Sequence, residues 1–339
     1  MTTGARFSRR SMFAGGGLLM LSTACGTSEQ QGGAGANTVA VRHRYGTADV
    51  PVKPKRVVTV GLTEQDYVIA FGTTPVAARE WFGGHPGALW PWARAKIGDD
   101  AVPEVLTRQA LDFERIASLR PDAILGMNSG ITKKDYTTLS GIAPTVAQPV
   151  DVADYGASWK GMTRTVGEIF GATGKADKLV ADIDGRLSAA RKQHPRFADA
   201  TGLLATSIDG TAWVYATGPA PRLLRTLGFK MPDDAAALFT DKQRKPVKLS
   251  LEKLKLLEAD VLLVGIYGDK SASVVREPLY QQLDVAQQGR DVLMPKQSTI
   301  NGAVSFSSVL SLPVALDGLV PRLAAAIDGD PATAVNPIG

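Results

Sequence analysis

The feature that most constrains the fold is an alternation of strand-like and helical segments on both sides of one long helical stretch. Before this stretch, β-branched runs such as Arg56 to Val60 alternate with helical segments such as Thr63 to Phe71. From Ala153 to His194, apolar residues recur at helical spacing, and only Gly171 to Gly174 interrupts them, where we expect a local break. The alternation resumes after Pro195. This pattern predicts an α/β fold in which two three-layer lobes with mainly parallel sheets are joined by one long backbone helix.

The two predicted lobes share an internal repeat. The segment 113–125 aligns with the segment 251–263, and Glu114 then matches Glu252. In each copy a glutamate opens a short helix, and an aspartate eight residues later opens a buried strand. Helix-to-strand units of this kind are common, so chance similarity is the alternative interpretation. A genuine repeat would place the two glutamates at equivalent corners of the lobes.

The first part of the chain has the features of an export signal. Its only cysteine, Cys25, follows three arginines and an uncharged stretch from Ser11 to Ala24 that ends in small residues. This stretch of 14 residues is too short to span a bilayer. Leu21 lies four positions before the cysteine, where a lipobox has its leucine at three, and a buried cysteine behind an apolar helix is the alternative. We expect a lipoprotein signal peptide at 1–24 and lipidation of Cys25.

The neighbouring residues indicate an export route and a tether. Arg9 and Arg10, with Phe13 shortly after, are typical of the twin-arginine route, and the general secretory route is the alternative. Two acyl chains on Cys25 would anchor the protein stably at the extracytoplasmic face of the cell membrane. Residues 25–38 are polar and glycine-rich, which predicts a flexible tether.

Composition excludes several kinds of site. The 339 residues are 44% apolar, enough for a sizeable core. The formal charge of +5 falls to +2 without the three signal arginines, and no basic run indicates nucleic-acid binding. A single cysteine excludes an intramolecular disulfide and a cysteine metal site. The predicted order after the tether is an N-terminal lobe at 39–152, a linking helix at 153–197, a C-terminal lobe at 198–328 and a tail at 329–339.

Three local motifs carry a family resemblance. Lys55 to Val58, followed by Gly61, reads as an opening strand, Glu114 to Asp122 has the pattern E-R-I-x-x-L-x-P-D, and Ile142 to Val146 reads I-A-P-T-V. Together these motifs resemble the helical-backbone class (class III) of periplasmic substrate-binding proteins of ABC importers, which serves iron siderophores, haem and cobalamin. The segments that look most like actinobacterial iron-siderophore uptake lipoproteins are Glu64 to Asp66, Trp81 with Phe82, Trp90 to Trp92 and Phe306 to Ser311.

The resemblance implies a function and partners. A protein of this class binds its ligand between the lobes and delivers it to a permease with its ATPase, so we expect a monomeric binding protein and no enzyme. The expected ligand is a ferric siderophore, without a cofactor, and haem or cobalamin is the alternative within the class. The family docks one glutamate of each lobe onto permease arginines, and the matching residues are Glu114 and Glu252. Each could equally be a solvated first-turn acid favoured by the helix dipole.

Aromatic residues and arginines follow the predicted strands, where open α/β sheets bind ligands. Three of the five tryptophans lie in one stretch of 12 residues, inside a glycine- and proline-rich loop. A ferric siderophore is bulky, often anionic and already saturates its metal, so aromatic surfaces and guanidinium groups suit it. Core packing and surface ion pairs are the alternative roles. The candidate ligand-binding residues are Thr63, Glu64, Arg79, Trp81, Trp90, Trp92, Asn128, Trp213, Tyr215, Arg222 and Tyr267.

Metal binding by the protein itself is not expected. The three histidines, His43, His85 and His194, lie in separate segments without ligand spacing. His85 or Tyr267 could ligate haem iron, which keeps haem as the main alternative ligand. Trp159 lies in the predicted linking helix, where we expect it to pack.

A membrane-anchored enzyme and an adhesive lipoprotein are the alternatives from other classes. Gly126 to Gly130 nearly forms a nucleophile elbow, but its serine is one place late. Gly171 to Lys175 is similar to a phosphate loop, yet Ala176 replaces the required serine or threonine. Because neither motif is complete, binding is favoured over catalysis.

Overall fold

The computed structural model describes most of the chain that follows the predicted signal and tether. The described residues are 37–98, 102–241, 244–268, 273–330 and 332–335. The predicted signal peptide, Cys25 and nearly all of the predicted tether lie outside the described residues. Within the described residues, no helix is both long enough and apolar enough to cross a membrane.

The N-terminal lobe contains a fully parallel five-stranded sheet in the order β5-β4-β3-β6-β7. Its central strands are buried along their whole length, which is typical of parallel strands covered on both faces. The strands are β3 (Val57–Thr59), β4 (Ala77–Arg79), β5 (Glu104–Leu106), β6 (Ala123–Leu125) and β7 (Thr145–Val146). The helices are α1 (Glu64–Ala70), η1 (Pro86–Ala88), α2 (Pro91–Arg94), α3 (Phe113–Ser118) and α4 (Lys133–Ser140).

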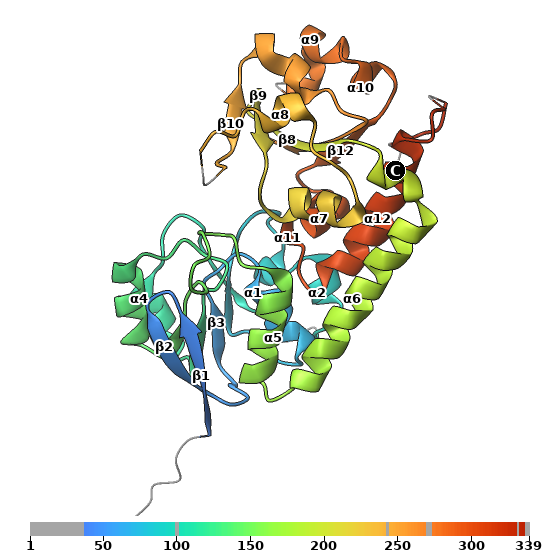
Figure 1. Ribbon diagram of the computed structural model, residues 1–339. Helices are drawn as coiled ribbons and strands as arrows, with labels where there is room; N and C mark the ends of the chain where they lie inside the picture. Colours follow the sequence, from blue (N-terminus) through green and yellow to red (C-terminus); the bar gives the residue numbers. More distant parts are fainter. Residues whose placement is uncertain (1–36, 99–101, 242–243, 269–272, 331, 336–339) are drawn as a thin grey trace, which may run out of the picture. The chain divides into compact units, whose positions relative to one another are not determined.

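A separate antiparallel hairpin precedes this sheet (Figure 1). It consists of β1 (Thr38–His43) and β2 (Gly46–Pro51), and it packs beside β7. Val41, His43, Ala48 and Val50 are buried, whereas their strand neighbours Arg42, Thr47 and Asp49 are exposed. This alternation is the period-two pattern of a half-buried strand, and the sequence analysis did not identify it.

The C-terminal lobe contains a mixed five-stranded sheet in the order β10-β9-β8-β11-β12. The three strands β8, β11 and β12 are parallel, and β9 runs antiparallel to both of its neighbours. Asp209 and Gly210 both have positive φ, as the two-residue turn between β8 and β9 requires. The strands are β8 (Gly202–Ile208), β9 (Thr211–Tyr215), β10 (Val247–Leu249), β11 (Val261–Tyr267) and β12 (Asp291–Pro295).

Helices and short 3₁₀ turns cover both faces of the second sheet. They are η2 (Pro195–Ala198), α7 (Pro219–Leu227), α8 (Asp233–Ala236), η3 (Leu251–Leu257), η5 (Val274–Arg276), α9 (Pro278–Gln281), α10 (Asp284–Gln287), α11 (Thr299–Phe306) and α12 (Ser311–Ala326). With parallel pairing dominant across the two sheets, the predicted α/β class with mainly parallel sheets is confirmed.

The linking segment consists of two helices and not of one. Helix α5 (Trp159–Ile169) and helix α6 (Thr173–Gln193) pack side by side, and only α6 extends to the C-terminal lobe (Figure 1). Gly171 has a φ of +61°, a conformation that favours glycine and lets the chain reverse. A Cβ on Gly167 would lie 2.5 Å from the Cβ of Ala176, so glycine also permits the close contact between the helices. The expected local break is therefore a full reversal, and the backbone helix is α6 alone.

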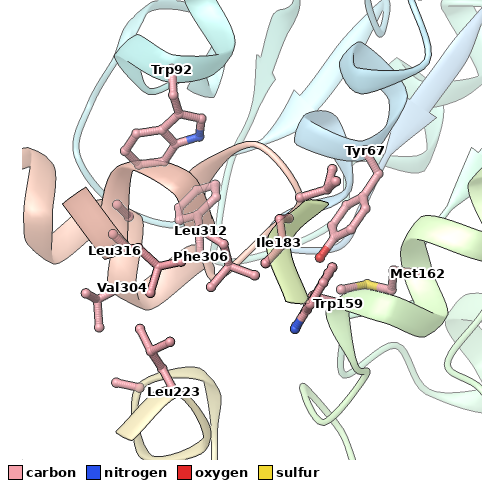
Figure 2. Packing of buried hydrophobic residues seen from close by; sticks show 14 of the residues in the cluster. Tyr67, Trp92, Trp159, Met162, Ile183, Leu223, Val304, Phe306, Leu312 and Leu316 are labelled. Carbon is pink, nitrogen blue, oxygen red and sulfur yellow. The ribbon is translucent and has the colours of Figure 1, made fainter. Parts of the chain in front are cut away.

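A second helix runs along α6. Helix α12 packs against α6 and also contacts α2 of the N-terminal lobe (Figure 1). One apolar core therefore continues through both lobes, and Trp159 lies in it as expected for a packing residue. Figure 2 shows part of this core, with Tyr67, Trp92, Trp159, Met162, Ile183, Leu223, Val304, Phe306, Leu312 and Leu316 labelled.

The internal repeat has a counterpart in the structure. Strands β6 and β11 occupy the same position in the order of their sheets. The Asp122 carboxylate accepts hydrogen bonds from the backbone N–H groups of Lys55 (2.7 Å) and Arg56 (2.9 Å), directly before β3. The Asp260 carboxylate accepts one from the N–H of Thr201 (2.6 Å), directly before β8. The two aspartates therefore fix the start of equivalent strands.

Candidate functional site

The two lobes meet near the carboxyl ends of their parallel strands. Phe82, three residues after β4, packs edge-on against Tyr267, the last residue of β11, with ring centroids 5.7 Å apart. The Tyr267 hydroxyl donates a hydrogen bond to Oδ1 of Asn301 on α11 (3.1 Å). Burial raises the pKa of Tyr267, and the positive charge of Arg108 from the other lobe opposes this shift. We call this region the inter-lobe site, because ligands of open α/β sheets bind at this edge.

An aromatic layer crosses the boundary between the lobes. It consists of Trp81, Phe82, Trp90, Trp92 and Phe306, of which only Phe306 comes from the C-terminal half. Trp81 stacks on Phe306 at 5.4 Å between centroids, and Trp90 stacks on Trp92 at 5.3 Å. Trp81 is partly exposed, whereas the other four side chains are buried. Trp81 is therefore the member of the layer that a ligand could contact directly.

Trp90 and Trp92 have a packing role in this structure. Trp90 is 1% exposed, and a Cβ on Gly302 of α11 would lie 2.6 Å from its indole ring. The ring of His85 lies 4.3 Å from that of Trp90. The indole N–H of Trp92 donates a hydrogen bond to Asp66 (2.8 Å). Both tryptophans would contact a ligand only if the layer opened.

A buried carboxylate joins the loops after β3 and β6. Glu64 accepts hydrogen bonds from the backbone N–H of Asn128 (2.5 Å) and of Thr63 (3.0 Å). The Asn128 amide also donates to the Thr63 hydroxyl (3.3 Å). Burial raises the pKa of Glu64, while these backbone hydrogen bonds and the charge of Arg79 oppose the shift. A Cβ on Gly61 would lie 2.0 Å from the Glu64 carboxylate, so glycine leaves the room that this carboxylate occupies. The candidate ligand residues Thr63, Glu64 and Asn128 are therefore hydrogen-bonded to one another inside the lobe.

Two arginines of the N-terminal lobe lie beside one another. The guanidinium of Arg79 donates to the carbonyl oxygens of Val60 (3.2 Å) and Arg108 (2.6 Å). Arg79 is partly buried, and Arg108 is exposed. Arg108 lies two residues after β5, a strand that the sequence analysis did not recognise, so its position at a carboxyl strand end was missed.

The C-terminal lobe contributes aromatic hydroxyls and further arginines. Trp213 and Tyr215 lie on one face of β9, both partly exposed, and the Tyr215 hydroxyl is 3.1 Å from the Thr206 hydroxyl. Arg222 of α7 donates to the carbonyl oxygen of Gly156, just before α5 (3.3 Å), so it connects the C-terminal lobe to the start of the linking segment.

Arg222 belongs to a group of close positive charges. Desolvation, followed by the positive charges of Arg222 and Arg244, lowers the pKa of Arg225. Within the described residues, no ion pair includes Arg79, Arg108, Arg222, Arg225 or Arg244. Arginines that lack an ion-pair partner place local positive charge on both lobes, which favours an anionic ligand.

The two repeat glutamates lie outside this region of contacts. Glu114 and Glu252 are exposed in the first turns of α3 and η3. Arg115, next to Glu114, pairs with Glu104, and no ion pair of the described residues includes either repeat glutamate. Both carboxylates are therefore accessible to a partner protein.

The described residues contain no group of three or more histidine, cysteine, aspartate or glutamate side chains that could hold a metal ion. His85 packs against Trp90, and the Tyr267 hydroxyl is hydrogen-bonded to Asn301. Either residue would have to leave its present partner to ligate haem iron.

Comparison with known proteins identifies the family. Residues 58–298 match the model of the periplasmic binding protein family. The chain is 29% identical over 265 residues to the probable siderophore-binding lipoprotein YfiY of Bacillus subtilis (strain 168). This alignment covers 75% of the present chain and 78% of YfiY.

Two solved structures have the same fold. The periplasmic solute binding protein from Mycobacterium smegmatis str. MC2 155 is 30% identical with a TM-score of 0.73, and the similarity covers 86% of this chain and 99% of that one. Streptococcus pneumoniae PiaA in complex with ferrichrome is 24% identical with a TM-score of 0.70 over 85% and 98% of the chains, which supports the fold alone. Because the family model spans most of the chain, the protein belongs to the periplasmic binding protein family.

Proposed function

We propose that the protein is the extracytoplasmic substrate-binding component of an ABC importer and that it binds a ferric siderophore between its lobes. The observation that carries the proposal is the contact of Phe82 with Tyr267, which brings the strand ends of the two lobes together near Arg108, a neighbour of Arg79. Membership of the family and the similarity to a siderophore-binding lipoprotein point to the same ligand class. Relatives of this kind are binding proteins, so the mechanism consists of binding and docking.

The proposed ligand contacts are the partly exposed residues of the inter-lobe site. Trp81, Trp213, Tyr215 and Tyr267 supply aromatic faces for a bulky organic chelate. The charge is supplied by the arginines that lack a carboxylate partner, and these are Arg79, Arg108, Arg222, Arg225 and Arg244. Arg79 contributes mainly charge, because backbone carbonyls already accept from two of its N–H groups.

The buried candidate residues hold the partly exposed residues of the inter-lobe site in position. Thr63, Glu64 and Asn128 fix the two strand-end loops, and Trp90 and Trp92 pack against Phe306, on which Trp81 stacks. We infer that their substitution would act through the position of the exposed residues.

Delivery and location complete the proposal. Glu114 and Glu252 dock onto a permease that works with its ATPase, and the protein acts as a monomer. Lipidation of Cys25 anchors it at the extracytoplasmic face of the membrane, after export by the twin-arginine or the general secretory route. The relative from Bacillus subtilis is itself named a lipoprotein, which supports this location.

Uptake of iron in cells tests the proposal. A strain lacking this protein is supplied with radioactive iron as hydroxamate, catecholate and carboxylate siderophore complexes, and as haemin. Loss of uptake of one ferric siderophore, restored by the wild-type gene, is the expected result. Loss of haemin uptake alone would replace the ligand by haem, and unchanged uptake of every complex would contradict the proposal.

A further inference from the structure

A buried carboxylate connects the N-terminal lobe to the turn between α11 and α12. Asp66 on α1 is 0% exposed. Its Oδ2 accepts hydrogen bonds from the indole N–H of Trp92 (2.8 Å) and from the hydroxyl of Ser308, which lies 242 positions later in the chain. Its Oδ1 is buried and has no hydrogen-bond partner among the described residues. Asp66 therefore joins three separate segments through one oxygen atom.

Ser308 fixes the turn that carries Phe306. The Ser308 hydroxyl oxygen accepts hydrogen bonds from the backbone N–H of Leu310 (3.2 Å) and Ser311 (3.0 Å), at the start of α12. Ser307 has a φ of +40°, an uncommon conformation for a residue other than glycine. Because Phe306 directly precedes this turn and stacks on Trp81, the position of Ser308 bears on the packing of this partly exposed tryptophan.

We propose that Asp66 is a positioning residue of the inter-lobe site, which holds the aromatic layer in place through Trp92 and Ser308 and holds it more firmly when it is ionised. The layer is a wall for the ligand only if the proposed function is correct, and in that respect the inference rests on it. The contacts themselves do not depend on any ligand. Ser308 lies beyond the residues 58–298 that match the family model.

Burial, and not a neighbouring charge, allows Asp66 to change its protonation state near neutral pH. Burial raises the pKa of Asp66 to about 7, and the hydrogen bonds from Ser308 and Trp92 oppose that rise. On α1, Glu64 is a second buried carboxylate, and Tyr67 is a buried phenol.

The elements packed against α1 bring few compensating charges. Burial raises the pKa of Tyr67, and the positive charge of Arg222 on α7 opposes this rise, so that charge acts on the cluster. On α2, Arg94 donates to the carbonyl oxygen of Gly98, and on α5, Lys160 pairs with Asp184.

Two further neighbours complete the surroundings of Asp66. The α11–α12 turn contributes the serine hydroxyls of Ser307, Ser308 and Ser311. The imidazole of His85 lies against Trp90 of the aromatic layer.

Ionisation strengthens both hydrogen bonds that Asp66 accepts. Bonds to a charged acceptor are roughly twice as strong as those between neutral groups. Protonation therefore leaves Trp92 and Ser308 more weakly held, and the aromatic layer loosens as the pH falls.

A pH titration of the unliganded protein tests the inference. Near-ultraviolet circular dichroism and tryptophan fluorescence are recorded between pH 5 and 9 for the chain without its predicted signal peptide. We expect one transition with a midpoint within about one unit of pH 7. Asp66→Asn keeps an acceptor oxygen but cannot ionise, so the transition should be lost. Ser308→Ala removes a bond that favours the carboxylate, so the midpoint should move to higher pH.

Matched controls separate Asp66 from its neighbours. Asp49→Asn changes an exposed carboxylate on β2 and should leave the transition unchanged. A transition that persists in Asp66→Asn would belong to another group and overturn the inference, as would the absence of any transition in the wild type. If Asp66→Asn does not fold, an unchanged midpoint in Ser308→Ala overturns it equally. Since no ligand is added, these outcomes are independent of the proposed function.

Discussion

The substitution Gly302→Ala should destabilise the protein, although the same change in an open helix position stabilises. Gly302 lies inside α11, and an alanine there would gain up to about 1 kcal/mol of helix propensity. A Cβ at this position, however, would lie 2.6 Å from three atoms of the Trp90 ring, far inside the 3.5–4.0 Å of a favourable carbon contact. Overpacking of a filled core costs about 1–3 kcal/mol, so we expect a net loss of about 1–2 kcal/mol in the free energy of unfolding.

Gly185→Ala is the matched control. Gly185 lies inside α6, and nothing is within 4 Å of the position that its Cβ would occupy. We expect this variant to gain about 0.5–1 kcal/mol, because only helix propensity changes. Urea unfolding followed by tryptophan fluorescence measures both values. If both variants shift stability in the same direction by similar amounts, the close packing of α11 against Trp90 is refuted.

Three further predictions concern charge, binding and docking. Because the pKa of Asp66 is raised in the folded state, the folded state binds more protons than the unfolded state. The wild type should therefore lose stability relative to Asp66→Asn as the pH rises from about 4 to about 7, by up to about 1.4 kcal/mol per pH unit. An equal difference between the two proteins in urea unfolding at pH 5 and at pH 7.5 would contradict this. Trp81→Ala and Arg222→Ala should each weaken ligand binding at least tenfold in calorimetry, with an unchanged far-ultraviolet spectrum. Glu114→Ala combined with Glu252→Ala should abolish uptake in cells without changing affinity, and normal uptake would reject docking.

Local signals were enough to predict most elements of the two lobes. Strands β3, β6 and β11 are short apolar runs bounded by glycine, proline or aspartate, and such runs identify buried parallel strands. The repeat between the lobes could also be recognised in the sequence, because Asp122 and Asp260 accept hydrogen bonds from the backbone at the start of equivalent strands.

Features that depend on tertiary packing could not be predicted locally. The reversal at Gly171 depends on the packing of α5 against α1 and α6, whereas the residues on both sides of it are equally helical. The Asp209–Gly210 pair did contain a hairpin signal, which was overlooked.

The sequence predicted which residues belong to the candidate site, but not which of their side chains are exposed. The three loop tryptophans do lie together in the aromatic layer, but α11, whose sequence lies some 200 residues later, packs against Trp90 and Trp92. Glu64 was expected to face a ligand and instead accepts two backbone hydrogen bonds. Contacts between residues as distant as Asp66 and Ser308 leave no local pattern in a single sequence.

The most direct test of the account is a tryptophan fluorescence titration of the chain without its predicted signal peptide. The titrants are ferric siderophores of the hydroxamate, catecholate and carboxylate classes, their iron-free forms, haemin and cobalamin, each corrected for inner-filter absorbance. The account predicts saturable quenching by an anionic ferric siderophore, with weaker binding of its iron-free form. Preference for haemin or cobalamin would contradict the proposed ligand, and no response to any compound would contradict the binding function itself.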